Sequence, residues 1–185
     1  MNILFVTSNA GKFIEAKKIL KERGINIAHK HDLIQEVRAE DCAVVAKEAA
    51  RYAYEKYRKP LFVEDSGIFI KSLEGFPGAY SAYVYRKIGL DGILKLLENK
   101  KDRSAEFVSC IGYADKDIIK IFSGKCVGNI AKRISGSEGF GYDPIFIPKG
   151  KKSTFGEDKN LKDVISHRRL ALEKLAIFLK KRFGF

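Results

Sequence analysis

The sequence predicts an α/β fold with a mixed central β-sheet flanked by helices. In the first half, short apolar runs of strand length alternate with helical periodicity, which is typical of parallel strands joined by helices. Two later β-rich runs, residues 105–114 and 118–130, flank a short acidic turn and predict a hairpin. With 185 residues, 45% of them hydrophobic, we expect one domain over residues 1–185, folded as two lobes around a cleft.

The first half of the chain is expected to form two strands and two helices before its central strand. Residues 3–7 are an apolar run of strand length, and a polar loop leads from them into a helical pattern that stops at Gly24. The apolar residues of that helix are Phe13, Ala16, Ile19 and Leu20. Residues 25–28 form a second strand, and Asp41 can cap a helix that ends before Pro60. The apolar face of this second helix consists of Val45, Ala49, Tyr52 and Ala53.

The central strand is expected to be short and to end in two carboxylates. Residues 61–63 are apolar, Glu64 and Asp65 follow, and residues 66–67 are expected to turn the chain before an apolar run resumes at residues 68–70. A buried carboxylate without a partner is costly, and two cost more. The pair therefore predicts a site for a cation, with two solvated acids at a strand end as the alternative.

The second half is expected to carry more loops. Residues 72–80 are punctuated by Gly and Pro, residues 90–97 predict a short helix, and residues 136–141 predict another loop. A last short strand follows at residues 145–147. The chain closes with a helix after Ser166, whose core-facing residues are Ala171, Leu172, Leu175, Phe178 and Leu179.

The composition restricts the cellular setting and the partners. The net charge of +12 favours anionic partners without choosing between nucleic acid, a phosphorylated small molecule and solubility. No apolar run is long enough to cross a bilayer, and we expect no signal peptide and no membrane partner. The three cysteines, Cys42, Cys110 and Cys126, are widely spaced in apolar surroundings, as in reduced thiols of a cytoplasmic protein.

The N-terminal loop has the arrangement of an anion site. Ser8, Asn9, Ala10, Gly11 and Lys12 connect a strand to a helix, so that backbone amides and a helix N-terminus point at a ligand. The positive charge of Lys12 in the first helical turn is unfavourable beside the positive end of the helix dipole, unless a negative group is bound nearby. A Walker A loop is excluded, because Val6 and Phe13 replace its first Gly and its Ser/Thr. Helix capping by Ser8 or Asn9 is the alternative.

Other candidate sites have simpler explanations. Phe140 and Tyr142 are more often core aromatics than a base-stacking surface, and His167 and Arg168 in a first helical turn are more often exposed. Ser166 beside His167 is a poor catalytic pair, because adjacent residues seldom face each other. Two histidines near residue 30 make a weak metal signal without a third ligand.

Five ordered motifs together resemble a known family. They are Thr7-Ser8-Asn9-Ala10-Gly11-Lys12, Val63-Glu64-Asp65-Ser66-Gly67, Gly75-Phe76-Pro77-Gly78-Ala79-Tyr80-Ser81, Gly139-Phe140-Gly141-Tyr142-Asp143-Pro144-Ile145-Phe146 and Ser166-His167-Arg168. This set looks like the inosine/xanthosine triphosphate pyrophosphatases and covers the chain from the first strand to the last helix. The resemblance implies a Mg²⁺-dependent hydrolase, usually a homodimer, that cleaves ITP, dITP or XTP to the monophosphate and pyrophosphate.

The resemblance also implies roles for individual residues. Asp65 would bind Mg²⁺ and act as the general base, with Glu64 beside it and Glu36 as a further metal ligand. The substrate-binding residues would be Thr7, Ser8, Asn9, Ala10, Gly11, Lys12, Ser66, Phe140, Gly141, Tyr142, Asp143, Lys162, His167 and Arg168. Of these, Thr7 to Lys12 would hold phosphate, and His167 and Arg168 would read the purine.

The chain departs from the family pattern in several places. Residues 155–158 read Phe-Gly-Glu-Asp instead of Phe-Ala-Glu-Met, and the segment onward to Ser166 is about one residue short. This difference in length affects the assignment of Lys162 to the family's substrate-binding lysine. Gln35 replaces the usual proline before Glu36. A basic substrate contact in the helix before the central strand could be Lys47 or Arg51, and both remain open.

Two rival functions differ from this resemblance in features that the sequence can show. The septum-associated nucleotide pyrophosphatases share the general architecture, but their first loop usually reads Ser-Pro-Arg-Arg. A basic nucleic-acid-binding protein would show aromatic residues interleaved with Lys and Arg on one face. No such motif is present in the sequence, so nucleic acid is not an expected partner.

Overall fold

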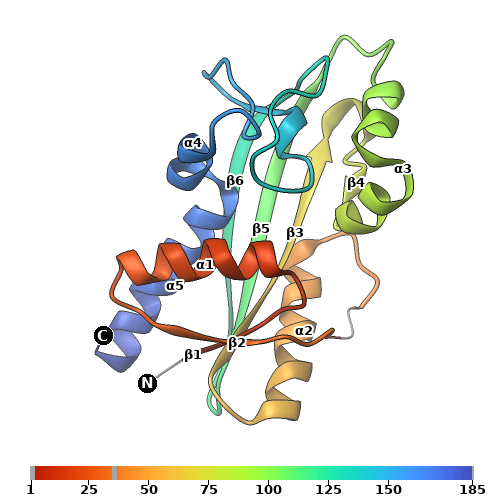
Figure 1. Cartoon of the computed structure of the whole chain (residues 1–185). Helices are drawn as coiled ribbons and strands as arrows, with labels where there is room; N and C mark the ends of the chain where they lie inside the picture. The colour runs from red at the N-terminus through yellow and green to blue at the C-terminus, as the bar shows by residue number, and fades with distance from the viewer. Residues whose placement is uncertain (1–2, 35–36, 185) are drawn as a thin grey trace.

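The structure is a computed structural model that describes residues 3–34 and 37–184. Within these residues, seven strands form one mixed sheet in the order β2-β1-β3-β5-β6-β7, with β4 paired to β3 (Figure 1). The strands are β1 (Ile3–Val6), β2 (Ile27–Lys30), β3 (Leu61–Ile70), β4 (Pro77–Gly78), β5 (Ser104–Ala114), β6 (Ile119–Ile130) and β7 (Phe146–Pro148). Strand β1 runs parallel to β2 and β3, and the remaining pairs are antiparallel. The predicted mixed sheet and the β5–β6 hairpin are confirmed.

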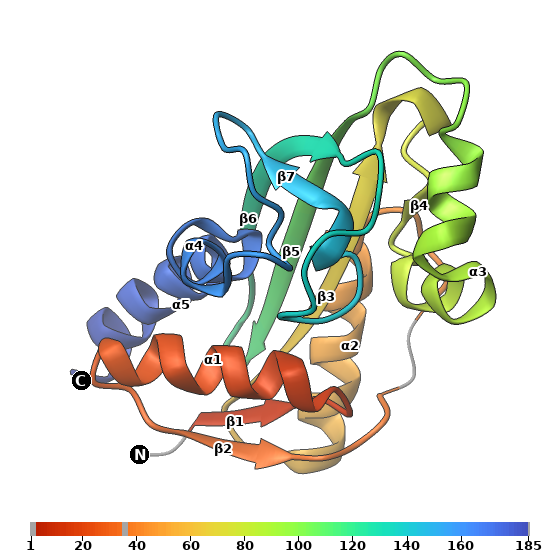
Figure 2. The same cartoon turned by 45° about the horizontal axis from the view of Figure 1, so that its top comes forward.

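Helices cover both faces of this sheet, as predicted. They are α1 (Ala10–Glu22), α2 (Cys42–Tyr57), α3 (Ser81–Leu96), α4 (Lys159–Ile165) and α5 (His167–Phe183), with 3-10 turns at Lys71–Leu73 and Asp143–Ile145. Helix α1 lies in front of the sheet and α2 behind it (Figure 2). Phe62 of β3 packs in one core cluster with residues of α1 and α5, whereas Leu61 and Val63 pack with residues of α2. Alternate residues of β3 therefore face different helices.

The predicted end of the central strand after Val63 is wrong. Strand β3 continues through Glu64 and Asp65 to Ile70, and residues 66–67 do not turn the chain. The reason is a long antiparallel partner, because β5 pairs with β3 along its whole length, from Leu61 opposite Ala114 onward. Strand β1 pairs with β3 only as far as Phe62, and β4 pairs with the same edge at Ile68 and Phe69, so this edge of β3 is open only between them.

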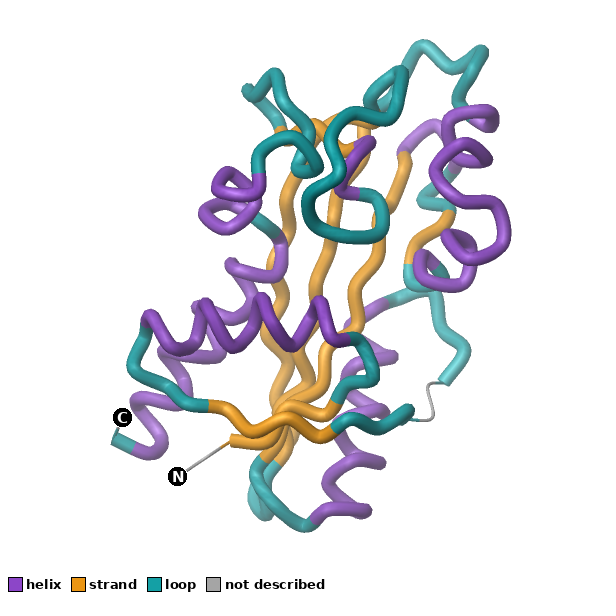
Figure 3. The backbone as a smooth tube through the Cα atoms, viewed as in Figure 1, coloured by secondary structure: helices purple, strands orange, loops and turns teal. Residues whose placement is uncertain are grey.

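A second cluster forms the other lobe. Ile68 and Ile70 of β3 pack there with Ile93 of α3 and with Phe146 of β7. The long loop between β6 and β7 lies in front of the upper halves of the central strands (Figure 3). Glu64, Asp65 and Ser66 consequently fall on β3 between the two lobes.

Several boundaries differ from the prediction for local reasons. Helix α3 begins nine residues before the predicted residue 90, and its two halves meet at Gly89, whose φ of 63° favours glycine. Its first half carries exposed tyrosines, so the pattern of buried residues did not identify it. Helix α4 was not predicted, because its seven residues, about two turns, offer little periodicity. Strand β2 begins two residues later than expected.

The predicted helix cap at Asp41 and the predicted core thiols are confirmed. The side chain of Asp41 accepts a hydrogen bond from the Ala43 amide at the start of α2, and Ser166 accepts one from Arg169 in α5. All three cysteines are buried and free. Within the described part of the chain, no helix combines the length and the apolar character that a bilayer crossing needs.

Candidate active site

A cleft of about 600 Å³ lies between the two lobes. It opens at the carboxyl end of β1, along the uncovered edge of β3, which is where open α/β sheets usually bind ligands. Every described residue of the predicted site lines this cleft except Ala10, which begins α1. Glu36, predicted as a metal ligand, lies outside the described residues.

The first loop is stabilised by its own hydrogen bonds. Asn9, rather than Ser8, caps α1, since its Oδ1 accepts from the Lys12 amide at 3.0 Å. The Asn9 amide donates to the Thr7 hydroxyl at 3.1 Å. Gly11 permits close packing, because a Cβ there would lie 2.9 Å from the Phe140 ring. The loop therefore carries the helix N-terminus and Lys12 into the cleft.

Lys12 caps the open edge of the central strand. Its Nζ donates to the backbone oxygen of Glu64 at 3.0 Å and lies 3.9 Å from the Glu64 carboxylate. This carbonyl has no β1 partner, because β1 pairing stops at Phe62. An ammonium group has three N–H donors, so Lys12 keeps donors for a bound phosphate.

Arg168 and Glu64 form a buried ion pair in the cleft wall. The Arg168 Nε donates to both Glu64 oxygens at 3.0 and 2.9 Å, and its Nη1 donates to Glu15 at 2.5 Å. Glu64 also accepts from the Ser109 hydroxyl at 2.6 Å. Burial acts to raise the pKa of Glu64, but Arg168, Lys12 and Ser109 outweigh burial and hold the pKa below its usual value. The alternative that Arg168 lies exposed on the surface is wrong, since Arg168 is only 2% exposed.

Glu64 and Asp65 point to opposite faces of β3. Glu64 faces Arg168 of α5, whereas Asp65 lies next to Cys42 on the α2 side, where both side chains are buried. Burial and then the Asp65 carboxylate, which accepts a hydrogen bond from the thiol, raise the pKa of Cys42. The two carboxylates therefore do not share one environment, as adjacent acids at a strand end would. Their metal-binding roles stay predictions.

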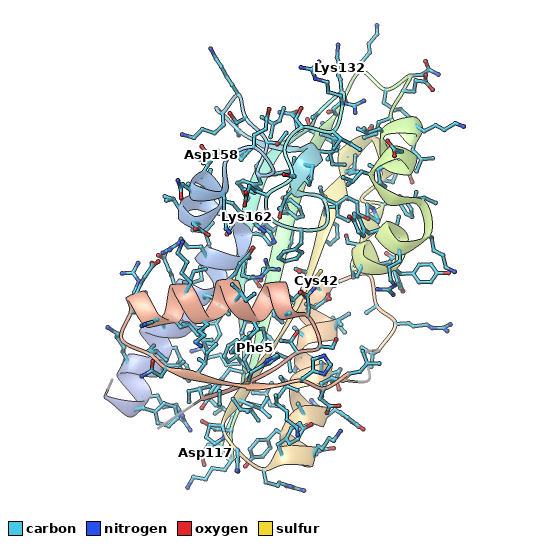
Figure 4. All side chains as sticks on the ribbon, in the orientation of Figure 1. Phe5, Cys42, Asp117, Lys132, Asp158 and Lys162 are labelled. Carbon is cyan, nitrogen blue, oxygen red and sulfur yellow. The ribbon has the colours of Figure 1, made fainter. Side chains whose placement is uncertain are left out.

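The loop that carries Phe140 is fixed by buried polar contacts. Asp143 accepts from the Phe140 amide and from Lys162 Nζ, both at 2.7 Å. Lys162 (labelled in Figure 4) also donates to Glu15 at 2.6 Å and lies 4.3 Å from the Phe140 ring centroid. Tyr142 donates to the backbone oxygen of Ser81 at 2.8 Å and so joins this loop to α3. These contacts place the Phe140 ring beside Gly11 of the first loop.

His167 carries an unsatisfied nitrogen in the cleft. Its ring stacks on Phe107 with a centroid distance of 4.5 Å, and its Nδ1 is buried without a hydrogen-bond partner among the described residues. Burial, followed by the charges of Arg168 and Lys162, lowers the pKa of His167 well below its usual value. The imidazole is therefore neutral at pH 7 and can still bond to a ligand.

We expect this burial to make stability depend on pH. The unfolded His167 binds a proton below its normal pKa near 6.5, while the folded imidazole stays neutral, so acid favours unfolding. Between pH 7.5 and 5.5, wild-type protein should lose about 1.4 kcal/mol of unfolding free energy relative to His167→Gln. Urea denaturation at both pH values measures this difference. The exposed His31, replaced by Gln, is the control, and equal pH dependence of all three proteins would contradict the expectation.

One ion-pair partner of the cleft cations was missed, and two expected substrate contacts lie elsewhere. Glu15 was missed, although it sits one helical turn after Lys12 on the same side of α1 and contacts both Lys162 and Arg168. Lys47 and Arg51 do not line the cleft. The residues of α2 that do line it are the apolar Val45 and Ala49. Helix α2 therefore supplies no cation to the site.

Comparison with known proteins agrees with this architecture. A sequence model of the Ham1 family matches residues 3–178. Relatives named dITP/XTP pyrophosphatase include a Methanopyrus kandleri protein, 47% identical over 97% of each chain, and a Saccharolobus solfataricus protein, 46% identical over 95% of this chain and 92% of that one. A solved Ham1 protein of Coxiella burnetii, 29% identical, superposes with a TM-score of 0.81 over 97% of this chain and 99% of its own. A Staphylococcus aureus Ham1 protein, 30% identical, gives 0.79 with the same coverage. The chain belongs to the Ham1 family.

Proposed function

We propose that this protein hydrolyses the non-canonical purine nucleoside triphosphates dITP, XTP and ITP to the nucleoside monophosphate and pyrophosphate. One observation carries the proposal. A single cleft combines a helix N-terminus with Lys12, the carboxylate of Asp65 and an aromatic pocket that contains the neutral His167. The names of the relatives that are 44–47% identical to this chain support the same substrate class.

The phosphate chain would bind along the first loop. The free amides at the start of α1 and the Lys12 ammonium are donors for anionic oxygens, and charge-assisted hydrogen bonds of this kind are strong. Ser66, which faces the same side of β3 as Glu64, can contact the substrate through its hydroxyl. The site thereby orients the phosphates toward the middle of β3.

Asp65 has the chemistry that a magnesium ion requires. Mg²⁺ prefers oxygen ligands and is usually held by one or two carboxylates together with substrate phosphates. Asp65 offers carboxylate oxygens at the cleft, and Glu36 is the second ligand that we propose. A bound Mg²⁺ would offset phosphate charge and stabilise the negative charge that develops during hydrolysis. Asp65 would orient the attacking water and accept its proton, for attack in line with the bond between the α and β phosphates.

Purine selection would depend on donors that adenine cannot satisfy. Of the five N–H donors of Arg168, one bonds Glu64, one Glu15 and one Ser66, so two remain for a ligand. The 6-oxo group of hypoxanthine or xanthine accepts hydrogen bonds, whereas the 6-amino group of adenine donates them. Adenine would leave buried donors unpaired, and such sites reject the wrong ligand strongly.

A panel of nucleoside triphosphates tests the proposal. With Mg²⁺ present, kcat/KM should be at least about 10²-fold higher for dITP, ITP and XTP than for ATP. The phosphorus product should be pyrophosphate and not orthophosphate. A preference for another base would favour the septum-associated pyrophosphatase alternative, and an absence of hydrolysis would contradict an enzymatic role.

We further propose a homodimer of single-domain chains in the cytoplasm, acting on free nucleotides without nucleic acid or a membrane. The family resemblance and the buried, free cysteines support this setting. Light scattering during gel filtration should give twice the chain mass of 20.8 kDa. A single chain mass at micromolar concentration would contradict the dimer.

A further inference from the structure

The cations on the inner walls of the cleft are already paired with carboxylates. Lys12 lies near Glu64, Arg168 bonds Glu64 and Glu15, and Lys162 bonds Glu15 and Asp143. These walls therefore carry little net positive charge, although the proposed substrate is a polyanion. A bound triphosphate needs further positive charge beyond what these pairs leave available.

Arg86 of α3 is different from these cations. It lines the cleft, is exposed, and forms no ion pair, hydrogen bond or cation–π contact within the described residues. Neither α2 nor the described part of the β2–α2 loop supplies an unpaired cation to the cleft. The cleft-lining residues of α2 are apolar, and Asp32 of the loop is held by Lys56 at 2.7 Å. Arg86 is thus the uncompensated cation of the described cleft wall.

The first half of α3 holds Arg86 in place. Tyr80, Tyr83 and Arg86 recur every three residues, so they share one helix face, and all three line the cleft. The Ser81 hydroxyl anchors this segment, since it accepts from the Ile68 amide at 2.8 Å and donates to the Gly78 oxygen at 2.6 Å. The Tyr85 ring packs against Tyr142 at 5.6 Å. A fixed helix therefore presents Arg86 from the wall that belongs to α3.

We propose that Arg86 binds the phosphate chain of the substrate from the α3 wall, an inference that rests on the proposed nucleotide substrate. A guanidinium group matches phosphate oxygens with paired N–H donors, and it stays charged at every working pH. Since no carboxylate among the described residues offsets this charge, the charge is available to attract a bound anion. The adjacent tyrosine hydroxyls on the same face can donate further hydrogen bonds. The polyphosphate is thereby held between the first loop and α3.

The direct test is binding of inorganic tripolyphosphate, measured by titration calorimetry in the absence of nucleotide. Arg86→Gln should bind it about 10-fold more weakly than wild type, since a hydrogen bond to a charged group is lost. Arg86→Lys keeps the positive charge but lacks the paired N–H donors of the guanidinium group, so its affinity for tripolyphosphate should lie between those of wild type and Arg86→Gln. Lys95→Gln is the matched control, because Lys95 lies in the last turn of α3 and does not line the cleft.

Equal tripolyphosphate affinity in wild type and Arg86→Gln would overturn the inference, as would no binding by wild type. Unfolding midpoints should be unchanged, because the Arg86 side chain has no partner to lose among the residues that the structure describes. The KM for dITP should rise about 10-fold in Arg86→Gln and not in Lys95→Gln. If wild type bound tripolyphosphate through Arg86 but hydrolysed no purine triphosphate, the proposed function would fail while the anion-binding role of Arg86 stood.

Discussion

Asp65→Asn is expected to lower kcat for dITP by about 10³-fold or more, with the fold intact. The substitution keeps the shape of the side chain but removes the negative charge and the proton acceptor. General-base catalysis contributes roughly 10²–10⁴-fold, and loss of a metal ligand adds to that cost. Asp65 is 8% exposed, and its neighbour Cys42 can still donate to the amide oxygen of Asn. The free energy of unfolding should therefore change by less than about 1 kcal/mol.

Steady-state pyrophosphate release and urea denaturation measure these two quantities side by side. Asp91→Asn is the matched control, because Asp91 is an exposed acid of α3 that does not line the cleft. It should keep wild-type activity. A near-normal rate for Asp65→Asn would remove Asp65 from the chemistry, whereas loss of activity together with unfolding would be a structural effect and leave the catalytic role without support.

The local features of the site could be predicted because they depend on adjacent residues. The strand, loop and helix around Asn9 and the cap at Ser166 are readable from residue type and spacing. The family resemblance based on five ordered motifs then predicted that distant segments contribute to one site. Alternation along a strand is equally local, yet the opposite orientations of Glu64 and Asp65 were missed because the strand was expected to stop before them.

What could not be predicted depends on contacts between distant segments. Strand β3 continues through two carboxylates because β5 pairs with it and because α5 brings Arg168 to Glu64, 104 residues away. Glu15 is similar, since its partners lie in α4 and α5. A carboxylate that is costly when buried alone is tolerated beside a guanidinium group, and nothing near Glu64 in sequence supplies one.

Arg168→Ala is expected to lower the free energy of unfolding by about 3–5 kcal/mol, because it leaves Glu64 without its buried counter-charge. Both partners are 2% exposed at the side chain, so water cannot replace the lost bonds. The control is Arg23→Ala, which breaks an exposed pair with Glu173 and should cost at most about 1 kcal/mol. Adding Glu64→Gln to Arg168→Ala should recover part of the loss, since it removes the uncompensated charge. No recovery in this double variant would contradict the electrostatic explanation.

The same variant separates the structural role of Arg168 from its role in base selection. If its two remaining N–H donors contact the 6-oxo group, Arg168→Ala should lower the ratio of kcat/KM for ITP to that for ATP by about 10-fold or more. Loss of folded protein lowers both rates equally and leaves this ratio unchanged. The ratio is therefore insensitive to the stability cost, provided that it is measured where the variant is still folded. An unchanged ratio would assign Arg168 to the support of Glu64 alone and leave His167 as the side chain that contacts the purine edge.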